Sequence, residues 1–220
     1  IWFNEVTSDV AIIDQRWLPS EFRIATLKTR DQFANAIRDM WVRGAPLIGA
    51  TAAYGVAMEM AADSSDQALD HVWHTLNETR PTAINLRWAL DRCRGHLAPL
   101  APDARPKAAL QLAHEIAEED VETNRMLGVH GLALIRDISA RKPQGEPVRV
   151  LTHCNAGWLA TVDWGTATSP IYHAAEEGID VYVYADETRP RNQGGITAWE
   201  LGSHGVPHAY LVDNAGGHLM

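Results

Sequence analysis

Three clusters of polar and reactive residues occur near the end of the chain, each directly after a predicted strand. They are THCNAG (152–157), ADETRPRNQG (185–194) and VDNAGGH (212–218). Because ligands bind beyond the carboxyl ends of the strands of an open parallel sheet, these clusters are expected on one edge. The spacing predicts a site formed by Cys154, Asn155, Asp186, Glu187, Arg189, Gln193, Asp213 and Asn214.

Cys154 is the candidate reactive group of this site. A buried cysteine usually packs as a small hydrophobic residue, and this is the interpretation for Cys93, inside a predicted helix. Cys154 instead ends a predicted strand, shortly before a helix expected over roughly residues 158–177. A helix N-terminus lowers the pKa of a nearby thiol, which can then act as an acid, a base or a nucleophile. The position alone leaves packing and catalysis open.

A second kind of site is indicated by two arginines that precede prolines in a helical region. Arg43, Gly44 and Ala45 come just before Pro46, which suits the first turn of a helix. The run RPT, which begins at Arg80, repeats the pattern. Backbone N–H groups at a helix start can bind a phosphate together with an arginine. The alternative is a tight turn between helices with an exposed arginine.

Several functional classes are excluded by what the sequence lacks. The ten histidines form no paired metal-ligand pattern, and there is neither a P-loop nor a GxGxxG run, so we expect no metal and no nucleotide cofactor. A formal charge of −9 argues against a nucleic-acid partner. No apolar run reaches the length of a membrane span. Two cysteines form no disulfide framework, which predicts a cytoplasmic protein.

The elements that must position these residues change in character along the chain. Residues 1–28 alternate weakly and predict short strands, and helical periodicity begins at Thr29. The polar stretch 139–147 is the best linker candidate. After it, strands and helices alternate as β-α-β-α-β, which predicts a parallel sheet. Both ends of the sequence begin or stop inside apparent structure, so we expect a piece of a longer protein.

Six motifs together resemble the methylthioribose-1-phosphate isomerases. They are RGAPLIGATAAYG, RPTAINL, LTHCNAGWLAT, YADETRPRNQG, TAWEL and DNAGGHLM, and they cover essentially the whole chain. That family shares its fold with ribose-1,5-bisphosphate isomerases and with regulatory subunits of the exchange factor for translation initiation factor 2. The resemblance implies an α/β fold: a small N-terminal β-meander plus helical domain (1–145), then the first part of a Rossmann-like parallel-sheet domain (146–220), incomplete in this chain.

The resemblance also implies an activity, the isomerisation of 5-methylthioribose 1-phosphate to 5-methylthioribulose 1-phosphate in methionine salvage. It implies a homodimer, a sugar-phosphate substrate, and no metal or organic cofactor. Matched motif by motif, Cys154 is the catalytic thiol. The implied substrate-binding residues are Arg43, Gly44, Ala45, Arg80 and Gln193.

The chain departs from the family pattern in two respects. The family's catalytic aspartate, and an Asn-Lys pair that also holds substrate, belong to motifs beyond Met220, so we expect residues 1–220 alone to be inactive. Neither Asp186 nor Asp213 takes that place, because their motifs have their own family positions. Trp158 and Trp164 stand where many relatives have smaller residues, which affects the pocket for the substituent at C5.

Three alternative functions remain open at this point. A ribose-1,5-bisphosphate isomerase would need extra basic residues near 158–170, where Trp158, Val162 and Trp164 offer apolar surface instead. A 5-deoxyribose-1-phosphate isomerase has no feature that separates it from the first candidate. A non-enzymatic translation-factor subunit would need neither the thiol nor the DETRPRNQG run.

Overall fold

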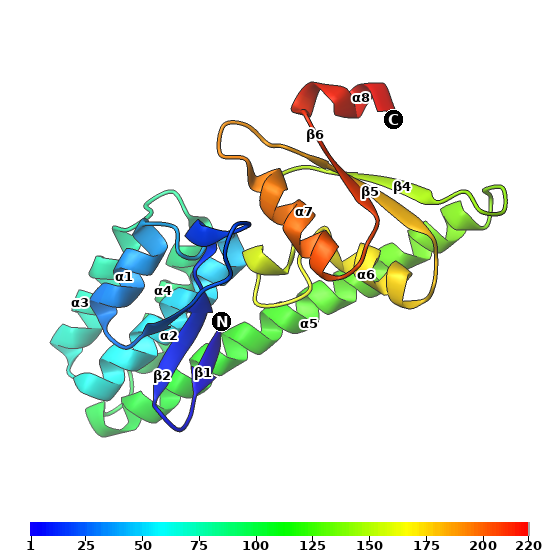
Figure 1. Ribbon diagram of the computed structural model, residues 1–220. Helices are drawn as coiled ribbons and strands as arrows, with labels where there is room; N and C mark the ends of the chain where they lie inside the picture. Colours follow the sequence, from blue (N-terminus) through cyan, green and yellow to red (C-terminus); the bar gives the residue numbers. More distant parts are fainter. Residues whose placement is uncertain (220) are drawn as a thin grey trace. The chain divides into compact units, whose positions relative to one another are not determined.

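A small antiparallel sheet, a group of helices and a parallel sheet follow one another along the chain (Figure 1). The structure, a computed structural model, describes residues 1–219. It separates into two compact units, Ile1–Asp120 and the part from Val121 onward, with the boundary inside the long helix α5 (Arg105–Ser139). The predicted linker does connect α5 to the parallel sheet. The domain boundary proposed at 145/146 stays a prediction.

The N-terminal strands form the predicted meander. β2 is the central strand and pairs antiparallel with both neighbours, so that Val10 lies opposite Phe3 on one side and Leu27 on the other. Val10 and Leu27 are fully buried, which places one face of this sheet against the first unit's core. The strands are β1 (Trp2–Asn4), β2 (Asp9–Ile13) and β3 (Ile24–Leu27).

Helix α2 is the central helix of the first unit. Its residues are small and apolar on all sides, which predicts a helix surrounded by others, and it contacts α1, α3 and α4. A Cβ on Gly55 would lie 3.1 Å from both Phe33 and Leu76, so glycine permits this close packing. The helices around it are α1 (Arg30–Arg38), α2 itself (Ala45–Ala62), α3 (Asp66–Asn77) and α4 (Ile84–Leu97).

The second unit contains the predicted parallel sheet, with strand order β4–β5–β6 and both pairings parallel. Alternate residues of β5 divide between the two faces, since Val181 and Val183 are buried whereas Tyr182 and Tyr184 are half-buried. The elements are β4 (Val148–Thr152), α6 (Ser169–Glu176), β5 (Val181–Asp186), α7 (Gln193–Ser203), β6 (His208–Leu211) and α8 (Gly216–Leu219).

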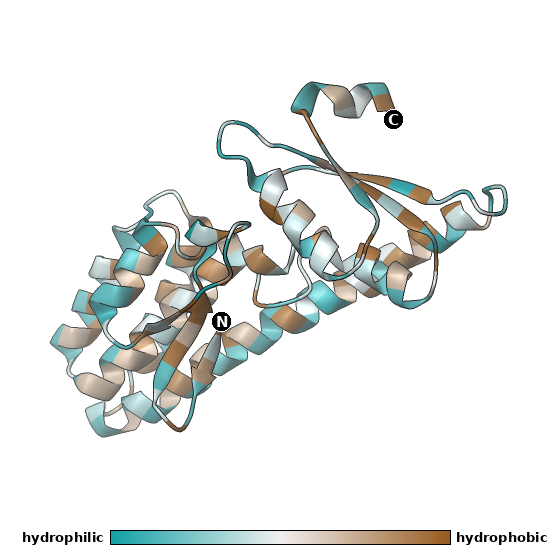
Figure 2. Ribbon diagram, in the orientation of Figure 1, coloured by the Kyte–Doolittle hydropathy of each residue, from teal (hydrophilic) through white to brown (hydrophobic). Residues whose placement is uncertain are grey.

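One hydrophobic core lies between this sheet and the helices of the second unit. Buried residues of α5, α6 and α7 pack against the strands in a single cluster, and Figure 1 draws these three helices on the same side of the sheet. Figure 2 shows strands β4 and β5 largely brown and the loop after β5 teal, which separates core from rim. The fold class expected from the sequence is therefore confirmed.

Two local expectations are wrong. The helix expected over 158–177 is present only as α6, and a single 3-10 turn (Trp158–Ala160) followed by irregular chain precedes it. Trp164 and Gly165 both have positive φ (67° and 79°), which a helix cannot accommodate. No α-helix starts directly behind Cys154, so the argument from a helix N-terminus at the thiol fails.

None of the helices in residues 1–219 combines the length and the apolar character needed to cross a bilayer.

Candidate functional site

The structure brings the three polar loops of the second unit together at the carboxyl edge of the sheet. The parallel registers place Thr152 beside Ala185 and Asp186 beside Leu211, so the three strands end at one level. Hydrogen bonds then join the loops. His153 Nδ1 lies 3.3 Å from Asp186 Oδ2, which links the first loop to the end of β5.

Cys154 is held by both of its backbone polar groups. Its N–H donates to Thr188 Oγ1 at 2.7 Å, and its carbonyl accepts from Thr197 Oγ1 at 2.8 Å. The residue is half-buried and its φ is 68°, in the left-handed region. That conformation costs a residue with a Cβ about 1–2 kcal/mol, so the two hydroxyl contacts stabilise a strained backbone at the candidate thiol.

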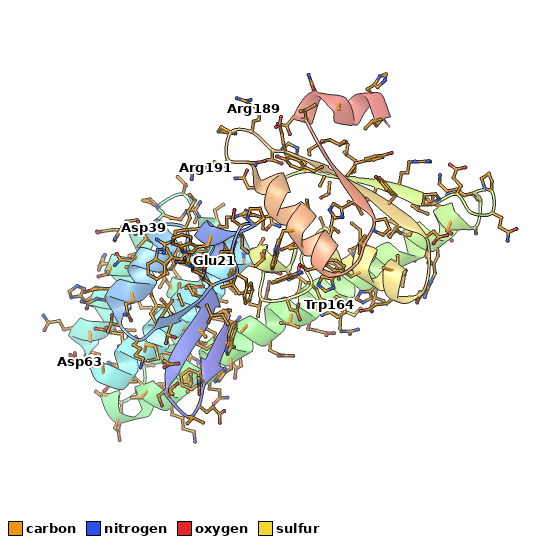
Figure 3. The ribbon with its side chains drawn as sticks, viewed as in Figure 1. Glu21, Asp39, Asp63, Trp164, Arg189 and Arg191 are labelled. Carbon is orange, nitrogen blue, oxygen red and sulfur yellow. The ribbon has the colours of Figure 1, made fainter. Side chains whose placement is uncertain are left out.

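The loop after β5 is fixed in turn by Asp213. One carboxylate oxygen accepts from the Thr188 N–H at 2.7 Å and the other from the Arg189 N–H at 2.9 Å. These backbone donors hold the pKa of the Asp213 carboxyl below its usual value, and the N–H of Arg189 has the larger effect. Figure 3 shows Arg189 and Arg191 on this loop. Asp213 therefore acts as the anchor of the loop that contacts Cys154.

The N-terminal turns of helix α7 hold the first loop in place. Gln193, the first helical residue, and Thr197 lie one turn apart, with Thr197 Oγ1 3.5 Å from the Gln193 carbonyl oxygen. Asn155 Nδ2 donates to the same hydroxyl at 3.2 Å. Gly194 brings the helix onto β5, since any Cβ there would collide with the carbonyl of Asp186. Thr197 thus connects Cys154 to Gln193, two predicted site residues.

A cluster of possible metal ligands lies on the same rim. His153, Asp186 and Asp213 each offer an atom within 4.8 Å of the others. Asp186 already faces His153, and both oxygens of Asp213 already accept backbone hydrogen bonds. Internal hydrogen bonding accounts for Asp213 and for Asp186 Oδ2, whereas Asp186 Oδ1 is buried without a partner among the described residues. The expectation of no metal stays a prediction.

The other predicted substrate-binding residues lie in the first unit. Gly44 precedes α2 with a φ of 96°, and Arg43 and Ala45 flank it, so the first-turn N–H groups of α2 begin here as expected. Arg80 does not start a helix. It begins a turn closed by the Ala83 N–H on the Arg80 carbonyl at 3.0 Å, and α4 starts only at Ile84.

The starts of α2 and α4 are nevertheless neighbours within the first unit. A Cβ on Gly49, in the second turn of α2, would lie 3.1 Å from the carbonyl oxygen of Asn85, in the first turn of α4. The two arginine-bearing segments, ending at Arg43 and Arg80, thus lead into adjacent helix starts. That Arg43 and Arg80 bind an anion there stays a prediction.

The two tryptophans expected to shape the pocket make packing contacts within the second unit. Trp158 and Trp164 pack against the hydrophobic core of the second unit. Trp158 also contacts the Trp199 ring, with centroids 5.9 Å apart, and Trp164 contacts His173 at 4.5 Å. Both rings are only partly buried there, and the expectation that they provide apolar surface for the substrate stays a prediction.

Sequence reasoning missed Thr188 and Thr197. Thr188 lies inside the DETRPRNQG run, and Thr197 comes four residues after Gln193, on the same helical face. This four-residue spacing from Gln193 could have identified Thr197 as a candidate site residue from the sequence. Nothing local marks the contact between the Thr188 hydroxyl and Cys154, because the two residues are 34 positions apart in the sequence.

Comparisons with known proteins find relatives that match the whole chain. Proteins named methylthioribose-1-phosphate isomerase from Sinorhizobium medicae and Escherichia coli are 68% and 57% identical over the whole chain. The match covers 61% and 59% of their lengths, so the chain spans about three fifths of these curated relatives.

Two solved structures share the fold. Translation initiation factor eIF-2B subunit delta from A. fulgidus superposes with a TM-score of 0.85 at 36% identity, covering all of this chain and 63% of that one. The 5-methylthioribose 1-phosphate isomerase from Pyrococcus horikoshii superposes with a TM-score of 0.83 at 36% identity, covering 96% and 59%. Residues 41–220 match the profile of the Initiation factor 2 subunit family, and the chain belongs to that family.

Proposed function

We propose that the protein is an aldose–ketose isomerase that converts 5-methylthioribose 1-phosphate into 5-methylthioribulose 1-phosphate. The proposal rests on the polar rim of the second unit, where one hydroxyl contacts the backbone carbonyls of both Cys154 and Gln193. It occurs in a chain 57–68% identical to proteins that bear the name of this isomerase. A translation-factor subunit has no evident use for such a held thiol, although its fold is equally similar.

The roles follow from the chemistry of each group. Arg43, with the N–H groups of Gly44 and Ala45, binds the phosphate or sugar hydroxyls, and Arg80 adds a second guanidinium. Gln193 binds a hydroxyl through its amide. Cys154 exchanges a proton with the substrate, together with an aspartate expected outside residues 1–220.

The substrate explains why an acid and a base are both needed. Phosphate on the anomeric oxygen blocks the usual opening of the sugar ring to a free aldehyde. The ring oxygen must gain a proton as the ring opens, and the C2 hydroxyl must lose one as the ketone forms. Cys154 is proposed as one member of this acid–base pair.

Two routes move the hydrogen between C2 and C1. A base can remove the C2 proton to give an enediol, which is then protonated at C1, or a hydride can pass directly from C2 to C1. A water-excluding pocket favours the hydride, because it protects an oxocarbenium-like species. We expect no deuterium at C1 of product formed in D₂O. Deuterium there, detected by NMR, would count against direct transfer.

The proposed thiol role is tested by Cys154→Ser in the protein expressed at its full natural length. We expect kcat to fall by about 100-fold or more while KM changes little, because the thiol acts mainly on the transition state. Cys93→Ser is the matched control and should keep wild-type kcat, since Cys93 is buried inside α4. Near-wild-type turnover of the Cys154 variant would overturn the proposal.

The substrate is tested by comparing three sugars in the same assay. The values of kcat/KM for the 5-methylthio, 5-deoxy and 1,5-bisphosphate compounds report how the site treats the substituent at C5. We expect the methylthio compound to be preferred. A preference for either other sugar assigns the corresponding isomerase, and no turnover of any of them would favour the regulatory-subunit alternative.

The oligomeric state, the metabolic role and the cellular location belong to the same proposal. A homodimer, a place in methionine salvage and a cytoplasmic location are what the resemblance implies. Sedimentation equilibrium of the full-length protein tests the dimer, and growth of a deletion strain on methylthioribose as the sulfur source tests the metabolic role.

A further inference from the structure

We propose that Thr188 and Thr197 are positioning residues that hold the Cys154 thiol in its working orientation. The inference rests on the proposed role of Cys154. It concerns residues that act through the cysteine backbone rather than on the substrate.

The inference rests on two hydrogen bonds, one to each of the peptide units that flank the α-carbon of Cys154. We call this pair of contacts, made by Thr188 and Thr197, the grip. The Cys154 N–H belongs to the preceding peptide unit and donates to Thr188 Oγ1 at 2.7 Å. The Cys154 carbonyl belongs to the following unit and accepts from Thr197 Oγ1 at 2.8 Å. Fixing both peptide planes fixes φ and ψ of Cys154, and therefore the direction of its Cα–Cβ bond.

The backbone conformation makes this grip necessary. Cys154 has a φ of 68°, which a residue with a Cβ adopts only when its surroundings require it. Thr188 is itself at a φ of 59°, unusual for a β-branched residue. Without the hydroxyl contacts, Cys154 can relax to a negative φ, which would swing its thiol away from the rim.

Both hydroxyls are held by groups from other parts of the rim. The Thr188 N–H donates to Asp213 Oδ1 at 2.7 Å, and Thr188 Oγ1 donates to the Asp186 carbonyl at 3.0 Å. Thr197 is fully buried on α7 and accepts from Asn155 Nδ2 at 3.2 Å. The grip therefore combines the ends of β5 and β6 with the start of α7.

The test removes each hydroxyl while keeping the side-chain shape. Thr188→Val and Thr197→Val are made in the full-length protein, with Thr188→Ser and Thr197→Ser as the variants that keep the hydroxyl. Thr168→Val is the matched control. Thr168 is also fully buried in the second unit, but its hydroxyl bonds to the Trp164 carbonyl at 2.9 Å rather than to Cys154.

Two readouts separate positioning from general stability. The first is the split between kcat and KM for the isomerisation. The second is the rate of alkylation of Cys154 by iodoacetamide as a function of pH, which needs no substrate. Cys93 does not contribute to that rate, because its side chain is 1% exposed and burial raises the pKa of its thiol to about 12.

We expect each valine variant to lose about 100-fold in kcat, the size of effect that a small misplacement of a reacting group produces. KM should change by less than about threefold, because the substrate-binding groups are untouched. The rate of alkylation of Cys154 should change. Each serine variant should recover most of the loss, and Thr168→Val should match the wild type in both readouts.

Some outcomes overturn the inference. Valine variants with wild-type kcat and an unchanged alkylation profile would overturn it. If Cys154→Ser is inactive in the same assay, the proposed function stands even though the positioning inference fails. Failure of the serine variants to recover would also overturn it. If a valine variant does not fold, the alanine variant takes its place with the same expectation; at Thr188 alanine is also less strained at positive φ. If Cys154→Ser stays active, the proposed function fails and the alkylation profile alone tests the positioning.

Discussion

The carboxylate of Glu200 fills the space in which a Cβ atom on Gly157 would lie. Glu200 is completely buried on α7, and its Oε1 accepts from the Leu159 N–H at 2.6 Å. Gly157 has an ordinary φ of −90°, so glycine is required here by close approach and not by backbone conformation. This contact joins α7 to the segment that directly follows Cys154.

Gly157→Ala should therefore destabilise the protein by about 1–3 kcal/mol, the usual cost of overpacking a closed site. The reason is that a fully buried carboxylate must move. Urea denaturation measures the loss. Gly217→Ala is the control, because a Cβ there meets nothing within 4 Å. Equal stability of the two alanine variants would contradict the close approach.

Arg105 should be as sensitive as a core residue. Arg105 is 2% exposed, and its guanidinium donates to the Leu97 and Ala98 carbonyls at the end of α4, to the Ser64 carbonyl and to Asp66 Oδ1. A lysine keeps the charge but cannot reproduce this fork of donors. We expect Arg105→Lys to lower the free energy of unfolding by about 3 kcal/mol, because several carbonyls lose their donors.

The control for Arg105 is Arg125→Lys. Arg125 pairs with Glu122 one turn away in α5, and both side chains are largely solvated. Exposed pairs of this kind contribute little to stability, because solvent screens them. Urea denaturation should show a much larger loss in the free energy of unfolding for Arg105→Lys than for Arg125→Lys. Equally small losses would contradict a stabilising role for the hydrogen bonds of Arg105.

The two cysteines should react very differently. Burial raises the pKa of Cys93 to about 12, and its side chain is 1% exposed, whereas Cys154 is half-buried on the rim. A thiol reagent at mildly alkaline pH should therefore titrate one thiol in the folded protein and two after denaturation, since the thiolate is the reactive form. Rapid reaction of both thiols in the folded state would mean that α4 opens readily.

The rim of polar loops was predictable because it depends on order and periodicity. Apolar strands that alternate with helices make a parallel sheet, and polar runs after Thr152, Asp186 and Leu211 must then meet at one edge. The sequence likewise indicates a helix cap at Thr29 or Asp31, and the cap is Thr29, which forms a complete capping box with Gln32. Such features are encoded within a few residues of one another.

The grip on Cys154 was not predictable, because it depends on contacts over 34 and 43 residues. The same is true of the segment after Gly157. Its composition permits a helix, but positive φ at Trp164 and Gly165 and a hydrogen bond from the Ala167 N–H to the Ala156 carbonyl fold it back on itself. Tertiary packing decides such segments, and local propensity does not.

Asp213 should make the stability of the second unit depend on pH. The N–H groups of Arg189 and Thr188 hold the pKa of its carboxyl below the usual value. A lowered folded-state pKa stabilises the protein above the ordinary aspartate pKa of about 3.9, and this contribution is lost as the pH falls through the folded-state value. Asp213→Asn should thus melt below the wild type at neutral pH, and the gap should close in acid. A gap that persists unchanged at acid pH would show that the ionised carboxylate does not anchor the loop.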